Sequence, residues 1–224
     1  MKRLTAIFLL IINCFLLTAC NKTYKTIKTT ISEIRYNIFA GSSNNFDVTF
    51  MSGRREKDYV INGYNTELID FGIVTISIKN QDMEINSPRF SLTINTLRYD
   101  DILEKNPFDG TYVADIKSLV DNDLNSITIK LFMGDVVEDL QLQNLSINWK
   151  VDSKKALKIA CKELSKDLAP LITNEFLGET YIKIIKDTIV NNNSYYWYVN
   201  FVSRNGIYHS TIIDPMTSEI LAKK

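Results

Sequence analysis

The sequence predicts an α+β protein, in which an antiparallel β-rich domain over residues 32–149 precedes a small helix-plus-antiparallel-sheet domain over residues 150–224. Two observations predict this fold class. Apolar and polar residues alternate through most of 32–149, which is the pattern of half-buried strands. From residue 153 the apolar spacing becomes that of an amphipathic helix, and strand patterns then return. The first domain should be a sandwich or a barrel-like sheet.

The charge distribution also favours two units. Residues 32–149 contain 10 Lys/Arg and 18 Asp/Glu, whereas residues 150–224 contain 11 and 8. A hydrophobic content of 45% with 11% aromatic residues is typical of a packed core and excludes a disordered chain. The chain lacks a basic–aromatic motif, so we expect no nucleic-acid partner.

Residues 1–19 have the pattern of a secretory signal peptide. Lys2 and Arg3 precede an apolar run that is too short to span a bilayer, since a spanning helix needs roughly 20 apolar residues. The run ends in Leu17-Thr18-Ala19-Cys20, which resembles the lipobox of bacterial lipoproteins. That resemblance implies signal cleavage between Ala19 and Cys20, lipidation of Cys20 with fatty chains such as palmitate, and an extracytoplasmic location on the cell membrane.

Residues 20–31 are expected to be the lipidated cysteine and a polar tether. Their lysines have no neighbouring acids, and they are suited to lie near anionic lipid headgroups.

Strand patterns then follow one another through residues 32–149. They are centred on residues 34–38, 46–50, 73–78, 90–94, 127–131 and 145–149. Residues 97–105 and 114–122 are ambiguous between strand and helical turn. We identify no known family in this part of the chain.

The final third begins with a predicted helix. Asp152 or Ser153 can cap its start, and Pro170 follows its end. The apolar positions on one side of this helix are Ala156, Leu157, Ala160, Cys161, Leu164 and Leu168. Strands are expected at about 180–190, 194–203 and 206–213, with a short last strand through Ile220-Leu221.

This order of elements resembles the PepSY domain of peptidase propeptides and bacterial envelope proteins. The resemblance is carried by four pieces of the sequence. These are the helix at 151–160, the strand Trp197-Tyr198-Val199-Asn200-Phe201, the pair Gly206 and Tyr208, and the closing segment Ile213-Asp214-Pro215-Met216-Thr217-Ser218-Glu219-Ile220-Leu221. The family usually has Gly where this chain has Ser218. The resemblance implies an extracytoplasmic interaction or inhibitory module, in some cases attached to peptidases, and it implies no catalytic residues.

Two sets of residues are candidates for an interaction surface. Tyr196 and Tyr198 share one face of a predicted strand, where they either form ordinary sheet surface or dock a partner. Four lysines form a stripe along the predicted helix, which is either a solvated face or a contact for lipid, wall polymer or the acidic first domain. These are Lys154, Lys158, Lys162 and Lys166.

Motifs for catalysis, metals and cofactors are missing or incomplete in the sequence. His209 is the one histidine, and its neighbour Ser210 should point to the opposite face of a strand, which does not suit a catalytic triad. Asp121-Asn122-Asp123 starts like a calcium loop, but Ser126 and Phe132 replace the required glycine and glutamate. Cys161 is expected to be a buried apolar residue. We therefore expect no cofactor, no metal site and no catalytic residues.

The sequence thus favours a lipid-anchored, non-enzymatic binding or interaction module, with an envelope protein or wall polymer as partner. One class of partner would be an envelope peptidase whose activity it modulates. Two alternatives remain open. One is an envelope hydrolase whose carboxylates converge in the β-rich domain, and the other is a small solute-binding lipoprotein.

Overall fold

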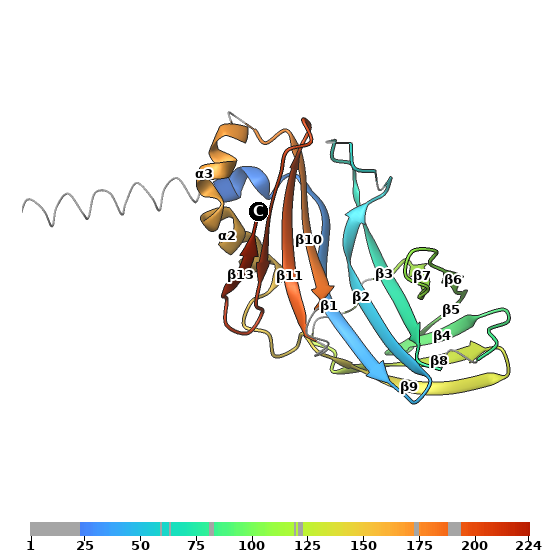
Figure 1. The fold of residues 1–224 in the computed structure, drawn as a ribbon. Coiled ribbons are helices and arrows are strands. Elements are labelled where there is room, and N and C mark those ends of the chain that lie inside the picture. Colours follow the sequence, from blue (N-terminus) through green and yellow to red (C-terminus); the bar gives the residue numbers. More distant parts are fainter. Residues whose placement is uncertain are drawn as a thin grey trace, which may run out of the picture. The chain divides into compact units, whose positions relative to one another are not determined.

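The computed structural model describes residues 23–58, 60–62, 64–80, 83–118, 120, 123–172, 175–187 and 194–224 (Figure 1). In these residues the chain is β-rich, which confirms that part of the predicted fold class. The chain forms two compact units. Unit 1 comprises the described parts of Met1–Ile34, Glu56–Glu67 and Lys150–Lys224, and unit 2 comprises Arg35–Arg55 and Leu68–Trp149.

Unit 2 is an antiparallel sheet in the strand order β6-β7-β3-β2-β1-β9-β8-β4-β5. Two of its strands, β1 and β2, continue into unit 1. The strands are β1 (Ile31–Ser42), β2 (Phe46–Glu56), β3 (Leu68–Ile78), β4 (Arg89–Ile94), β5 (Leu97–Ile102), β6 (Glu104–Lys105), β7 (Tyr112–Ile116), β8 (Ser126–Met133) and β9 (Val136–Asn144).

The alternating sequence pattern places one face of every long strand of unit 2 in a common core. In β2 the alternate residues Phe46, Val48 and Phe50 are fully buried, while the residues between them are half-buried. Leu92 of β4 and Ile129 of β8 join the same cluster. Burying each such side chain stabilises the fold by about 1.5–3 kcal/mol, so the sheet is held by the packing of its inner face.

Unit 1 contains α2 (Ser153–Glu163), α3 (Ser165–Leu168), a 3₁₀ turn (Ala169–Leu171) and a sheet in the order β13-β12-β11-β10-β1. Its further strands are β10 (Gly178–Lys186), β11 (Tyr195–Ser203), β12 (Tyr208–Ile213) and β13 (Ile220–Lys223). β1 pairs with β10 in parallel, and the other pairs are antiparallel.

The predicted helix forms because its start is capped and its apolar side is covered. A side-chain oxygen of Asp152 accepts a hydrogen bond from the backbone N–H of Lys155 at 2.7 Å. The six predicted apolar positions are all buried, Cys161 among them. α2 lies against β10, β11 and β12, on one face of the sheet (Figure 1). There the Trp197 indole N–H donates to the carbonyl of Val151 at 2.7 Å.

Two element predictions in unit 2 differ from the structure. The predicted strand at 145–149 is a turn, because Asn144 Oδ1 accepts hydrogen bonds from both the backbone N–H and the hydroxyl of Ser146. Conversely, the ambiguous segments contain strands β5, β6 and β7 and no helix in their described residues.

The segment 20–31, which was expected to be a polar tether, also differs from the prediction in its described residues. From Thr23 onward this segment is folded into unit 1: residues 23–27 are helical, Ile27 is fully buried, and β1 begins at Ile31. The hydroxyl groups of Thr30 and Thr180 lie 3.1 Å apart. The segment is short and mostly polar, so its sequence pattern did not predict the burial of Ile27.

In the part of the chain that the structure describes, no helix has the length and apolar character needed to cross a membrane.

Candidate functional site

The predicted lipidation and cleavage residues, Cys20 and Ala19, lie outside the described residues. The predicted interaction residues lie in unit 1, where the structure separates them onto two surfaces. Lys154, Lys158, Lys162 and Lys166 are all exposed on the side of α2 and α3 that is turned away from the sheet core. The Lys158 ammonium lies 5.3 Å from the centre of the Tyr24 ring.

Tyr196 and Tyr198 lie on the opposite face of the unit 1 sheet. Their neighbours Tyr195 and Trp197 are buried on the α2 side, whereas Tyr196 and Tyr198 are half-buried. Residues directly opposite each other in an antiparallel pair share a face, so the pairing extends this surface onto β10. Tyr198 is paired with Lys183, and Tyr196 with Ile185. We call this face of β10 and β11 the tyrosine face.

Three buried glutamates stand beside the tyrosine face, on three different strands. Glu33 of β1, Glu56 of β2 and Glu179 of β10 are 3%, 1% and 0% exposed. Carboxylates are rarely buried to this degree unless they are paired or hydrogen-bonded. Such a group therefore marks a part of the fold with a specific role.

Residues 57–67, which connect β2 to β3, donate hydrogen bonds to two of these carboxylates. Glu56 Oε1 accepts hydrogen bonds from the backbone N–H of Thr66 at 2.8 Å and from the amide of Asn65 at 3.3 Å. Glu179 Oε1 accepts from the backbone N–H of Asn62 at 3.4 Å. Because an ionised carboxylate only accepts hydrogen bonds, backbone donors suit these positions.

Tyr181 lies in the middle of the glutamate group and is 3% exposed. Burial raises the pKa of its hydroxyl above the ordinary value of 10.0, and the charge of Glu179, a hydrogen bond to Glu179 and the charges of Glu56 and Glu33 raise it further. The Lys183 ammonium forms an ion pair with Glu33 at 3.1 Å and lies 5.0 Å from the centre of the Tyr181 ring. We call these five residues the glutamate–tyrosine cluster.

Two acceptor atoms here have no hydrogen-bond partner among the described residues. One is Glu179 Oε2, and the other is Oδ1 of Asn200, which is paired with Tyr181 across β10 and β11. A buried acceptor without a donor costs about 1–3 kcal/mol. The half-buried tyrosines of the adjacent face favour a ligand with an apolar or aromatic surface.

The sequence pointed to Tyr196 and Tyr198 but not to the glutamate–tyrosine cluster. Glu33, Glu56 and Glu179 occupy polar positions at the ends of strand patterns, which are ordinarily solvated. Their burial depends on contacts between segments far apart in the chain. The one local signal is that Glu179 and Lys183 flank Tyr181 on the same face of a strand.

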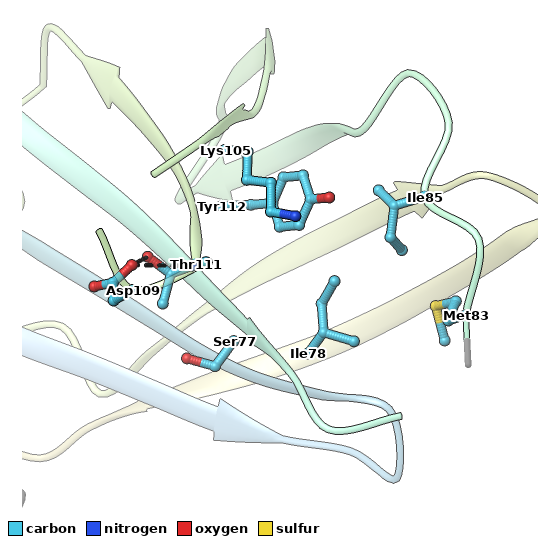
Figure 2. A pocket seen from close by; sticks show the side chains of 9 residues that line it. Ser77, Ile78, Met83, Ile85, Lys105, Asp109, Thr111 and Tyr112 are labelled. Atoms are coloured by element: carbon cyan, nitrogen blue, oxygen red, sulfur yellow. Dashed lines mark hydrogen bonds between the residues drawn. The ribbon is translucent and has the colours of Figure 1, made fainter. Parts of the chain in front are cut away.

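Unit 2 has a second candidate site, an open pocket of about 550 Å³ at one end of β3 and β7. Figure 2 shows Ile78, Met83 and Ile85 gathered at one end of the pocket, with Asp109 and Thr111 at the other and Lys105 and Tyr112 between them. The three aliphatic side chains also pack against the core of the unit. The pocket thus offers an apolar wall and a small polar rim, as small-molecule sites do.

The polar rim carries one fixed negative charge. Asp109 Oδ1 accepts hydrogen bonds from the hydroxyl of Thr111 at 2.7 Å and from its backbone N–H at 3.0 Å. These hydrogen bonds hold the pKa of the Asp109 carboxyl below its ordinary value of 3.8. Asp109 is therefore ionised at neutral pH, and it lines the same pocket as Lys105.

The remaining residues discussed from the sequence concern metal binding and catalysis. No group of three or more His, Cys, Asp or Glu side chains in the described residues is arranged to hold a metal ion. His209 is half-buried and paired with Phe201, whereas Ser210 is paired with Asn200 on the tyrosine face, so the two point to opposite faces. Asp121 and Asn122 lie outside the described residues.

Comparison of the chain with models of protein families, with curated proteins and with solved structures finds no match.

Proposed function

We propose that this chain is a lipid-anchored, extracytoplasmic and non-enzymatic binding protein, which docks a segment of an envelope protein on the tyrosine face. The observation that carries the proposal is the half-buried pair Tyr196 and Tyr198 on one face of β11. The lipobox-like Leu17-Thr18-Ala19-Cys20 supports the location.

The chemistry of the face supports a protein partner. Tyrosines offer large contact area at little cost in side-chain entropy, and they are enriched at protein interfaces. The likeness of residues 150–224 to PepSY domains supports an envelope peptidase as the partner, which this chain would modulate.

Site-specific photo-crosslinking in intact cells tests the proposal. A photoreactive phenylalanine analogue at Tyr198 should yield a covalent adduct with one defined partner. The same analogue at Tyr99, a half-buried tyrosine of β5 in unit 2, is the matched control and should yield none. Failure of both Tyr196 and Tyr198 to give an adduct, in protein of normal abundance, contradicts the proposal.

The pocket of unit 2 favours a second function, the binding of a small solute. Its aliphatic wall and its charges of both signs suit a small zwitterion with an apolar side chain. Native mass spectrometry of the purified protein with a mixture of free amino acids tests this. The Ile78→Trp variant should lose any adduct, because the larger side chain fills the pocket.

A further inference from the structure

The first described residues of the chain lie beside the lysine stripe. Residues 23–27 are helical, and Ile27 is fully buried. The ammonium group of Lys158 on α2 lies 5.3 Å from the centre of the Tyr24 ring. The described part of the chain therefore begins next to the middle of α2.

The distance from this point to the proposed anchor is limited by chain length. Three residue steps separate Thr23 from Cys20, and a fully extended chain covers at most about 3.6 Å per residue. The α-carbon of Cys20 is thus within about 11 Å of that of Thr23. If Cys20 carries acyl chains, as the proposed function requires, unit 1 is held directly against the membrane surface.

The surface next to that point is strongly basic. Lys154, Lys158, Lys162 and Lys166 repeat every four residues, so they follow one side of the helices, and all four are exposed. Lys25 and Lys28 are also exposed, and residues 23–30 contain no acid.

The acids on α2, α3 and the adjacent cap offset only part of this charge. Asp152 is engaged in capping the helix, and Glu163 pairs with Lys223 at 2.6 Å. Asp167 is the remaining acid on these helices. The positive charge on this side of unit 1 is therefore in excess.

We infer that the lysine stripe of α2 and α3 binds the anionic headgroups of the membrane that carries the anchor. The inference rests on the proposed function and adds an orientation to it. Each lysine near an anionic surface strengthens binding on the order of five-fold, and salt weakens the attraction. With α2 against the membrane, the tyrosine face on the other side of the same sheet points away from it, toward a partner.

Lysine labelling of the purified lipidated full-length protein tests this orientation. The protein is reconstituted into vesicles of phosphatidylcholine alone or mixed with phosphatidylglycerol, and acetylation rates are measured by mass spectrometry. The four stripe lysines should react on the order of five-fold more slowly on the anionic vesicles. High salt should abolish the difference. Lys57 and Lys186, which are exposed elsewhere in unit 1, should not respond.

A charge-reversal variant sharpens the test. With Lys158→Glu and Lys162→Glu together, Lys154 and Lys166 should react at rates that do not depend on vesicle charge, whereas Lys57→Glu should leave the protection intact. Equal rates in the unchanged protein, with the protein still floating with the vesicles, overturn the orientation and leave the proposed anchor standing. Protein that does not float with either kind of vesicle overturns both.

Discussion

The Tyr181 hydroxyl lies among three buried carboxylates, and this has a consequence for stability at high pH. Because burial and the neighbouring charges raise its pKa above 10.0, the folded state keeps a proton that the unfolded chain loses. Stability from this group is fully present below pH 10 and is lost as the pH rises above it. In Tyr181→Phe, the fall in the free energy of unfolding above pH 10 should be shallower, as urea titrations at several pH values would show. Parallel curves for the two proteins would contradict this.

For single residues, the sequence predicted which face of a strand each side chain occupies, but it did not predict which polar side chains are buried. The alternation of Tyr195, Tyr196, Trp197 and Tyr198 correctly assigned each residue to a face, because strand geometry is local. The burial of Glu56 could not be predicted, because it depends on Asn65 and Thr66 in a connection that has no regular pattern.

Among the elements, α2 is the one that the sequence defined most completely, from its cap to its apolar side. Asp152→Ala removes the 2.7 Å hydrogen bond to the backbone of Lys155 and should lower the free energy of unfolding by about 0.5–2 kcal/mol. Chemical denaturation followed by circular dichroism measures this. Asp152→Ser, which keeps a capping oxygen, should stay close to the unchanged protein. Equal losses in both variants would show that the cap is not the cause.

Strands were less predictable than the helix, and the errors have local physical reasons. Residues 145–149 alternate like a strand, but the Asn144 side chain holds Ser146 in a turn. β5 contains Arg98, Asp100 and Asp101, and its residues are mostly exposed, so it lacks a strong apolar face. Its pairing with β4 was therefore not visible as alternation.

At the scale of the whole molecule, the sequence located the change of character near residue 150 but not the full membership of the units. Residues 23–34 and 56–67 belong with 150–224 in unit 1, because β1 pairs with β10 and the 57–67 connection contacts Glu179. Contacts between segments more than a hundred residues apart leave no periodic trace in one sequence.

Because residues 23–34 belong to unit 1, the proposed anchor and the proposed binding face are linked through the same unit. Thr23, α2 and the tyrosine face all belong to unit 1, with α2 on one face of the sheet and Tyr196 and Tyr198 on the other. A lipid at Cys20 would therefore fix which of these two surfaces a partner can reach.

Mass spectrometry of the N-terminal peptide of the native protein, purified from membranes, tests the central claim most directly. We predict that the first residue is Cys20 and that its sulfur carries a diacylglyceryl group, as two acyl chains are needed for stable anchoring. An intact leader, or an unmodified Cys20 thiol in the native protein, would contradict the account.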